Sequence, residues 1–445
     1  MQFVADFHIH SKYSRATSKD MDIDHLDKWA RIKGIKVLGT GDFTHHLWLK
    51  ELREKLEPAE RGLFRLKSFQ SGAREQKGIL SKFHIPKEEI RFVLTAEISC
   101  IYSKHNKTRK VHLVILAPSF EVVDKINAHL GWIGNLKSDG RPILGIDAKE
   151  ALKIVLSASE DCLVVPAHAW TPHFSVFGSV SGFDSLEECF DEYAKYIYAI
   201  ETGLSSDPAM NWRLSQLDKI TLISNSDSHS PTRIGREANI LDTELDYFSI
   251  TDVLRKRDLR KFLYTVEFFP EEGKYHYDGH RNCKVSFKPE ETKKHKGICP
   301  VCGKPLTIGV MYRVAQLADR PACNALGVAN AGRPEGGKPE KTIPFKNLIP
   351  LDQIVADALG MGVASKKAQE AYRELINKLG TEFKILLEAS REDISSASSS
   401  EIAEGVMRVR EGKVKIEPGY DGEYGKIKIF EDSERECPLK QKSLF

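Results

Sequence analysis

Short apolar, β-branched runs recur through about the first 230 residues, and each run ends in polar residues. The runs cover 2–10, 35–43, 90–99, 110–118, 161–170, 197–204 and 220–229. Segments with helical periodicity, such as 22–34 and 147–159, lie between them. Near-continuous apolar strands that alternate with helices predict an α/β fold with a parallel sheet covered by helices. Seven such strands favour a barrel over an open sheet.

The character of the chain changes after about residue 270, which gives four predicted regions. Residues 1–270 form the barrel, and 271–325 form a small module rich in histidine, cysteine and lysine. A stretch rich in glycine and proline then reads as a linker. Residues 340–430 have helical periodicity and form a helical C-terminal domain. Residues 431–445 form a flexible tail.

Histidines and carboxylates gather where the predicted strands end. Asp6, His8 and His10 alternate along the first run, so in a strand their side chains share one face. The C-terminal ends of barrel strands are where active sites are built, although His112 stands at the start of its run. Nitrogen and oxygen ligands without cysteine suit zinc, manganese or iron, and ions that share a carboxylate suit phosphoester hydrolysis. The candidate ligands are His8, His10, Asp42, His45, Glu97, His112, His168, Asp227 and His229.

A second metal motif lies in residues 271–325. His280-x-x-Cys283 and Cys299-x-x-Cys302, fifteen residues apart, have the spacing of a tetrahedral zinc ribbon. His295 and Cys323 compete with His280 for the fourth ligand position. Residues 273–313 hold nine Lys or Arg against three Asp or Glu. A basic zinc module beside a hydrolytic centre indicates contact with nucleic acid.

Two further surface features bear on the substrate. The insert 50–91 carries eleven Lys or Arg against seven Asp or Glu, and 102–110 adds another basic cluster near Glu97. Basic residues around a hydrolytic centre attract a polyanion through phosphate contacts. The loops 168–185 and 203–213 are rich in aromatic residues, which either form part of the core or wall a pocket for a base turned out of the duplex. The candidate substrate-binding residues are Trp170, Phe174, Ser179, Asp207, Met210, Asn211 and Trp212.

The stretches "DFHIHSKYS", "LTAEIS", "VHLVIL", "PAH" and "SNSDSH" resemble the motifs of the polymerase-and-histidinol-phosphatase (PHP) superfamily. That likeness implies a distorted (β/α)7 barrel with a di- or trinuclear metal centre. It implies that His8, His10, Glu97 and Asp227 hold one metal, and that Glu97 bridges to a second metal held by His112 and His168. A third metal would need Asp42 or His45 with His229. Arg15 stands where the superfamily has aspartate, and "GDFTH" replaces its T-D-H.

Residues 1–315 more specifically resemble the endonuclease Q family of archaea and some bacteria. The likeness rests on "GTGDFTH", "HAWTPHFSVFGS", "ETGLSSDPAMNW" and "GHRNC…CPVCGKPL". It implies incision of DNA on the 5′ side of deaminated bases (uracil, hypoxanthine, xanthine) and abasic sites. His8, His10, Glu97 and Asp227 would be the catalytic residues. The divalent metal would be zinc, with Mg²⁺ or Mn²⁺ as the alternatives for activity, and zinc would also fill the module.

Two other functions stay open on sequence alone. One is a PHP phosphatase acting on a small phosphomonoester, which leaves the basic zinc module without a purpose. The other is an accessory protein associated with a DNA polymerase, for which the nearly full ligand set would be unexpected.

Composition and the tail add two expectations. No apolar run approaches the length of about 20 residues that spans a membrane, and no secretory signal opens the chain, so we expect a cytoplasmic protein. The closing "QKSLF" resembles a shortened peptide that binds a sliding clamp (PCNA), with Gln441, Leu444 and Phe445 as anchors.

Overall fold

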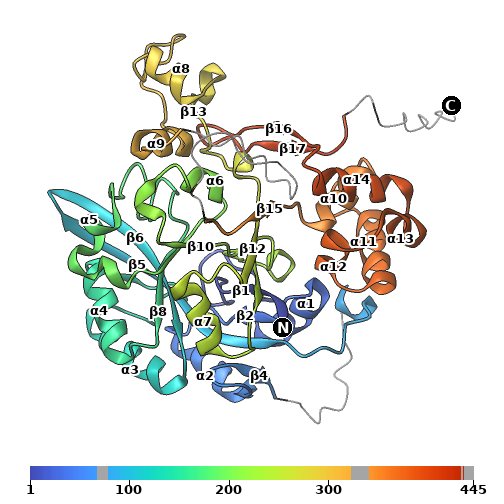
Figure 1. Cartoon of the computed structure of the whole chain (residues 1–445), viewed down its shortest axis with the longest axis horizontal. Coiled ribbons are helices and arrows are strands. Elements are labelled where there is room, and N and C mark those ends of the chain that lie inside the picture. Colours follow the sequence, from blue (N-terminus) through green and yellow to red (C-terminus); the bar gives the residue numbers. More distant parts are fainter. Residues whose placement is uncertain (68–78, 322–338, 340, 432–433, 435–445) are drawn as a thin grey trace.

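The computed structural model describes residues 1–67, 79–321, 339, 341–431 and 434. The predicted clamp-binding peptide and Cys323 therefore lie outside the described residues. Figure 1 shows a central mixed sheet with helices around it, a small module at one end and a group of C-terminal helices at one side. Among the described residues, no helix is both long enough and apolar enough to cross a bilayer.

The seven predicted strands are all present. They are β1 (Gln2–Asp6), β2 (Val37–Gly39), β5 (Arg91–Lys104), β6 (Lys107–Ala117), β8 (Leu163–Pro166), β9 (Ala199–Glu201) and β10 (Thr221–Ile223). The first three pair in parallel in the order β1-β2-β5, while β9 and β10 form a separate parallel pair. Most of these strands are buried along their whole length, which explains their near-continuous apolar sequence.

The expectation of an all-parallel sheet is wrong at β6. This strand pairs antiparallel with both β5 and β8. Only His105 and Asn106 separate it from β5, and both have positive φ angles of 53° and 58°. A two-residue turn of this kind joins antiparallel strands, whereas a parallel pair needs a long crossover. Because β6 runs back from the hairpin, the start of β6 lies at the same edge as the end of β5. The antiparallel register places His112 opposite Ser99, close to Glu97 in the middle of β5.

Backbone hydrogen bonds link the ends of the remaining strands. The N–H of Ala169, after β8, donates to Glu201 O at 2.9 Å, and the N–H of Thr202, after β9, donates to Ile223 O at 2.9 Å. The N–H of His10, after β1, donates to Ser228 O at 3.0 Å. The segments that follow β8, β9, β10 and β1 are therefore held side by side.

Other strands extend the sheet on both sides. Beyond β1 lie β11 (Ala238–Asp242), β12 (Phe262–Glu267) and β15 (Phe345–Asn347), and beside β5 lie β4 (Phe64–Leu66), β3 (Leu56–Pro58) and β7 (Ile143–Leu144). The strand β15 pairs in parallel with β12, so the segment before the C-terminal helices is part of the main sheet.

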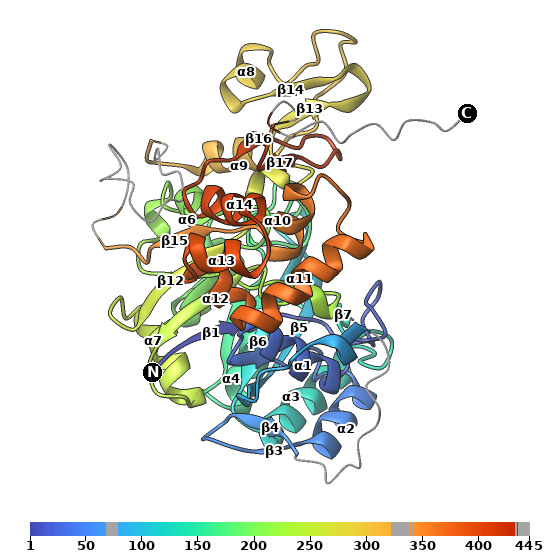
Figure 2. The same ribbon diagram turned by 90° about the vertical axis from the view of Figure 1, so that its right-hand side faces the viewer.

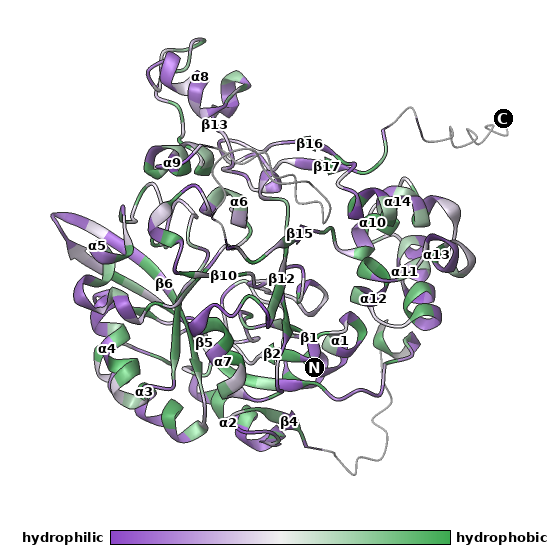
Figure 3. Ribbon diagram, viewed as in Figure 1, coloured by the Kyte–Doolittle hydropathy of each residue, from purple (hydrophilic) through white to green (hydrophobic). Residues whose placement is uncertain are grey.

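In the part of the chain that the structure describes, seven α-helices lie around this sheet: α1 (Ile23–Lys33), α2 (His46–Lys55), α3 (Phe120–Ile133), α4 (Ala148–Ala158), α5 (Leu186–Phe190), α6 (Pro208–Asn211) and α7 (Tyr247–Lys256). Short 3-10 turns occupy Ile79–Lys82, Asp191–Tyr196, Ser215–Leu217, Pro231–Arg233, Pro270–Glu272 and Arg281–Cys283. Figure 3 shows apolar residues on the central strands and on the sides of helices that face them. The buried apolar side chains of the described residues form one large core, a second core beneath α7 and a small third one in the module at 278–306.

The small module contains β13 (Asp278–His280), β14 (Val285–Phe287) and α8 (Pro289–Lys294), and α9 (Val310–Leu317) follows it. Figure 2 shows this module projecting from the rest of the molecule. The C-terminal hairpin of β16 (Lys415–Glu417) and β17 (Lys426–Lys428) lies close by, with a bridge between Tyr277 and Tyr420.

The C-terminal helices are α10 (Leu351–Ala358), α11 (Lys366–Leu379), α12 (Glu382–Leu387), α13 (Arg391–Ala397) and α14 (Ser400–Arg410). They attach to α1 through the buried Glu382. Its carboxylate lies 2.7 Å from Lys33 Nζ and accepts a hydrogen bond from Tyr372 at 2.6 Å. A buried ion pair of this kind fixes orientation more than it adds stability.

Candidate metal centre

Four side chains from distant parts of the sequence meet where β1 and β10 end, beside the middle of β5. The potential ligand atoms of His8, His10, Glu97 and Asp227 all lie within 4.8 Å of one another. His10 Nε2 lies 3.0 Å from Asp227 Oδ1 and 3.3 Å from Glu97 Oε2, and His8 Nε2 lies 3.6 Å from each of the same two oxygens. One ion placed among these atoms would have four ligands.

A second group shares Glu97. Its Oε1 lies 2.7 Å from His112 Nδ1 and 3.1 Å from His168 Nε2, and the two imidazole nitrogens are 3.1 Å apart. Glu97 thus turns Oε2 toward the first group and Oε1 toward the second. This arrangement suits a carboxylate that bridges two ions.

The local backbone brings these side chains into place. His112 pairs with Ser99 across the β5–β6 hairpin, so Glu97 is its diagonal neighbour on the same face. His168 and Asp227 have positive φ angles of 30° and 45°, which few residues other than glycine adopt. Strained backbone of this kind clusters at functional sites, because surrounding structure must hold it.

The imidazole nitrogens and carboxylate oxygens of the two groups suit divalent metal ions. His8 Nε2 is buried and makes no hydrogen bond among the described residues, although it faces two carboxylates. The facing nitrogens of His112 and His168 also need a cation or a proton between them. A set of four imidazoles and two carboxylates is appropriate for zinc, manganese or iron.

In the absence of metal ions, protons on neighbouring side chains compensate the negative charge of the carboxylates. Burial opposes ionisation of Glu97, but the neighbouring His112 imidazole and the Arg141 guanidinium hold its pKa well below the usual range. Burial likewise opposes charge on His8, yet the Glu201 and Glu97 carboxylates raise the pKa of that imidazole well above its usual value. The centre therefore attracts cations strongly, and metal binding must displace protons.

Glu201 contacts His8 on the side of the ring that faces away from the centre. This orienting role was not predicted from the sequence. Its two carboxylate oxygens lie 3.1 and 3.0 Å from His8 Nδ1, which leaves Nε2 free to face the centre. The same carboxylate accepts hydrogen bonds from the His168 N–H at 2.8 Å and from Asn225 Nδ2 at 2.9 Å. Carboxylates in this position orient metal-binding imidazoles and increase their basicity. The available signal was its place at the end of β9.

Asp42 has the same relation to His10. Its Oδ1 lies 3.1 Å from His10 Nδ1, and its Oδ2 accepts hydrogen bonds from Ser11 Oγ at 2.7 Å and Ser14 Oγ at 2.8 Å. Both oxygens are therefore used to orient and stabilise the first group, so Asp42 lies behind that group.

His45, His229 and Asp6 lie around the centre without joining either group of ligand atoms among the described residues. The His45 ring stacks on Tyr13 at 4.5 Å, and the His229 ring lies 4.5 Å from the His10 ring. A third ion stays a prediction. Asp6 accepts hydrogen bonds from the N–H groups of Ser226 and Gly235, so it supports the loop that carries Asp227.

The sulfur-containing group forms as the spacing predicts. His280, Cys283, Cys299 and Cys302 have potential ligand atoms within 4.8 Å of one another, and Cys302 Sγ lies 3.6 Å from His280 Nδ1. His295 instead stacks on Phe287 at 4.8 Å between ring centres. Of the two candidates that the structure describes, His280 and His295, it is His280 that lies with the cysteines.

The substrate-binding candidates fall into two sets. Phe174, which has a positive φ of 61°, places its ring 4.7 Å from the ring of His112, and Ser179 is exposed nearby in the same loop. Trp170 is buried, and its Nε1 donates to Asn211 Oδ1 at 2.7 Å. The Asp207 carboxylate caps α6 by accepting from the Met210 N–H at 2.8 Å.

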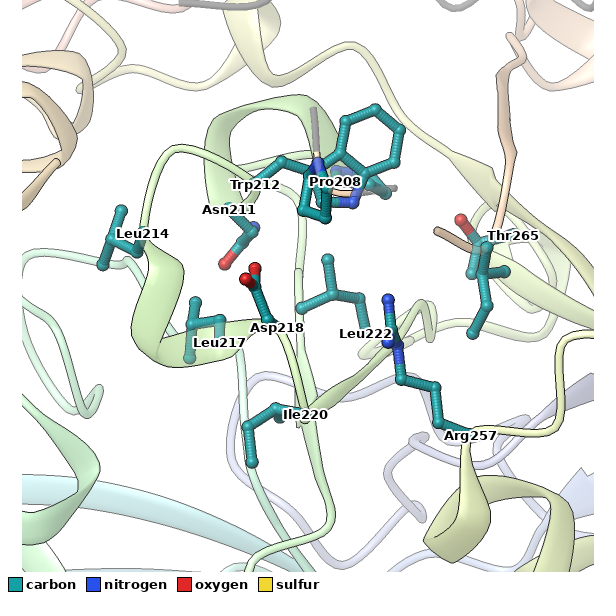
Figure 4. Close-up of a pocket in the computed structure, with 12 residues that line it drawn as sticks. Pro208, Asn211, Trp212, Leu214, Leu217, Asp218, Ile220, Leu222, Arg257 and Thr265 are labelled. Carbon is teal, nitrogen blue, oxygen red and sulfur yellow. The ribbon is translucent and has the colours of Figure 1, made fainter. Parts of the chain in front are cut away.

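Asn211 and Trp212 also line a separate pocket. Figure 4 shows the Arg257 side chain extending into this pocket, with Asp218 near its centre. The apolar side chains of Leu214, Leu217, Ile220 and Leu222 form most of the remaining wall.

Comparison with known proteins identifies relatives of parts of the chain. A family model described as "MJ0043 C-terminal domain" matches residues 350–413. The chain is 32% identical over 267 residues to the "Uncharacterized protein MJ0043" of Methanocaldococcus jannaschii, and 32% identical over 268 residues to the "Uncharacterized protein YqxK" of Bacillus subtilis. These matches cover 58% and 60% of this chain, and they span 31% and 61% of the two relatives.

Solved structures match nearly the whole chain. The lesion-specific endonuclease PfuEndoQ from Pyrococcus furiosus is 28% identical, with a TM-score of 0.80 over 98% of both chains. An endonuclease Q in complex with a 27-mer duplex, with an abasic lesion at the active site, is 29% identical, with a TM-score of 0.78 over 97% of both chains. These matches show that the chain has the fold of endonuclease Q over nearly its whole length.

Proposed function

We propose that this protein is a metal-dependent DNA repair endonuclease that hydrolyses the phosphodiester 5′ to deaminated bases and abasic sites. The observation that carries the proposal is the pair of ligand groups that share Glu97, in a chain that matches endonuclease Q along nearly its whole length. One such relative was solved with an abasic duplex at its active site. We further propose that the seven central strands are the distorted barrel of the PHP superfamily, with the domain boundaries predicted from sequence.

His8, His10, Glu97 and Asp227 would hold one ion, and Glu97, His112 and His168 the other. Ions bound there would supply an activated water and neutralise charge on the phosphoryl oxygens. The protein side chains keep these ligands in position: Glu201 directs His8, and Asp42 directs His10. Zinc fits the nitrogen-rich set, and Mg²⁺ or Mn²⁺ are the alternative ions for activity.

A basic groove beside the centre supports a DNA substrate. Lys107 and Lys110 of β6 line it together with His173 of the facing loop. Lys110 is two residues from His112 on the same strand face, and its Nζ lies 5.2 Å from the Phe174 ring. Neither lysine has a carboxylate partner among the described residues, whereas Lys104 of the same hairpin pairs with Asp191. Unpaired lysines next to a hydrolytic centre suit phosphate contacts.

Lesion selectivity would combine two effects. A deaminated base pairs poorly, so turning it out of the duplex costs less than the few kcal/mol needed for a normal pair. The loops 168–185 and 203–213 would then accept the base, with Phe174 next to the His112 side chain and Ser179 in the same loop. Trp170 and Asn211 are buried and hydrogen-bonded to each other, so they would shape this site from below.

The proposal predicts a specific cleavage pattern. The purified protein, with zinc, manganese or magnesium, is given duplexes that contain one uracil, hypoxanthine or abasic site, an undamaged duplex and a chromogenic phosphomonoester. We expect one cut 5′ to each lesion, with the damaged base still attached to its sugar. Release of free uracil would instead indicate a glycosylase, and hydrolysis of the phosphomonoester alone would indicate a phosphatase. Equal cutting of the undamaged duplex would contradict lesion recognition.

The tail offers a separate test of a partner. If 441–445 binds a sliding clamp, deletion of 437–445 should abolish clamp pull-down and leave cleavage of short oligonucleotides unchanged. Undiminished clamp binding by the truncated protein would contradict the assignment.

A further inference from the structure

Arg141 reaches the shared carboxylate of the metal centre from the loop between α3 and α4. Its Nη1 lies 3.1 Å from Glu97 Oε2, the oxygen that also faces His8 and His10. The Arg141 side chain is 29% exposed, whereas the Glu97 side chain is fully buried. The guanidinium therefore stands between the buried ligands and solvent, where a phosphate must approach.

The loop is shaped to hold Arg141 in this place. Asp139 Oδ1 accepts a hydrogen bond from the Arg141 N–H at 3.1 Å, and Thr44 Oγ1 donates to Gly140 O at 3.1 Å. A Cβ at Gly140 would lie 2.3 Å from Asp42 Oδ2, so only glycine lets the backbone run this close to the centre. The arginine is thus set on a loop that is anchored on both sides of its backbone.

The hydrogen-bonding capacity of Arg141 is largely unused. A guanidinium has five N–H donors, and Glu97 is the one hydrogen-bond partner of this side chain among the described residues. The same carboxylate oxygens face the two groups of potential metal ligands. Ions bound to Glu97 would satisfy its charge, which would leave the guanidinium free for another anion. A planar fork of donors fits two phosphate oxygens better than a point charge does.

We propose that Arg141 binds the non-bridging oxygens of the scissile phosphodiester and stabilises the charge that develops on them. This inference rests on the proposed function of the same site. During hydrolysis a water oxygen bonds to phosphorus, the water gives up a proton, one P–O ester bond breaks, and the departing sugar oxygen takes up a proton. Arg141 neither gains nor loses a proton in this step. It contributes a fixed positive charge at a partly buried position, where such a charge is more effective than in open solvent.

The test compares Arg141→Gln and Arg141→Lys with a matched control, Arg91→Gln. Arg91 opens the same strand β5 and is paired with Glu60, at distances of 2.5 and 2.9 Å, away from the centre. For each protein we would measure kcat and KM on an abasic duplex, metal content by elemental analysis, and binding of inorganic phosphate by calorimetry to the metal-loaded protein.

We expect Arg141→Gln to lower kcat about 100-fold or more, as loss of one donor to a developing oxyanion does. Metal content and KM for the duplex should stay close to wild type, phosphate binding should weaken, and Arg141→Lys should recover part of the loss. Arg91→Gln should leave all four quantities unchanged. Wild-type kcat in Arg141→Gln would overturn the proposal. Loss of metal together with activity would also overturn it, because Arg141 would then serve only to position Glu97.

Phosphate binding separates this proposal from the proposed function. If the wild-type protein fails to cut any DNA, yet binds inorganic phosphate in a manner that Arg141→Gln abolishes, the anion site stands and the nuclease assignment falls. If the wild-type protein cuts DNA and Arg141→Gln binds phosphate as well as it does, the nuclease assignment stands and the anion site falls.

Discussion

The nitrogen- and oxygen-rich centre and the sulfur-containing module are two candidate metal sites that the fold supports in opposite ways. The ligands of the centre span residues 8–227 and lie almost entirely buried at the edge of a large sheet. The ligands of the module span residues 280–302, with Cys302 exposed and only Val285, Cys299 and Leu306 forming its buried core.

The centre therefore depends on the fold of the protein, whereas the fold of the module depends on its metal site. The sheet and its hydrogen bonds hold the centre in place, so its side chains keep their positions whether or not ions are bound. The module has too little apolar area to fold on its own, and metal binding in such modules contributes directly to folding. Removing metal should therefore abolish activity at the centre and unfold structure at the module.

The largest expected effect comes from Glu97→Gln. The neutral side chain cannot bridge two ions, and metal-ion catalysis contributes several kcal/mol, so incision should fall about 1,000-fold or more. Metal content should drop while circular dichroism and thermal unfolding change little, because the sheet holds the site. Cleavage assays and elemental analysis measure both effects. Full activity in this variant would remove the centre from the mechanism.

Glu201→Gln should act on the same centre with a smaller effect. Its Oε2 lies 3.0 Å from His8 Nδ1 and fixes the orientation of that ring. Loss of a partner of this kind typically lowers metal affinity or activity about 10- to 100-fold. Metal titration followed by cleavage assays at saturating metal would distinguish affinity from rate. Glu60→Gln, which alters a carboxylate paired with Arg91, is the control and should match wild type. Equal metal affinity and equal rate in Glu201→Gln would contradict the assigned role.

Cys299→Ser tests the sulfur-containing module. This variant should release one zinc per chain and expose the module to proteolysis, while cleavage of the phosphodiester is weakened only through reduced DNA affinity. His295→Ala provides the matched control, since His295 lies in the module but outside the four-residue group. Loss of zinc in His295→Ala, or retention of zinc in Cys299→Ser, would contradict the assigned ligands.

The smallest effect on activity is expected from Glu267→Gln, which should instead change how stability depends on pH. Burial raises the pKa of Glu267 to about 8, against an ordinary value of about 4.3. A carboxyl with a raised pKa binds more protons in the folded state, so stability falls as pH rises from about 4.3 to about 8. Glu267→Gln should flatten this decline by up to about 5 kcal/mol, given about 1.4 kcal/mol for each of roughly 3.7 pKa units.

Thermal unfolding at a series of pH values between 5 and 9 would measure the change in slope. Thr202 and Thr265 donate hydrogen bonds to the Glu267 carboxylate, and an amide oxygen can accept one of them. An unchanged slope in Glu267→Gln would mean that other buried carboxyls, such as Glu237, dominate the pH dependence.

The sequence alone determined which residue types gather and which strands carry them. The alternation of apolar strands with helices predicted the α/β class, and the His-x-His and Cys-x-x-Cys spacings are local enough to indicate ligands directly. The two groups that share Glu97 come together as the family resemblance implied.

Only the tertiary structure decided which of those residues face the centre and which orient the others. The direction of β6 depends on two turn residues with positive φ, His105 and Asn106, and this direction brings His112 to Glu97. Glu201 and Asp42 serve behind the ligands, and Arg141 reaches Glu97 from a loop with no motif of its own. Residue type and spacing report local geometry, whereas these roles depend on contacts between segments far apart in the chain. Such contacts exist only once the sheet has set the position of every strand end.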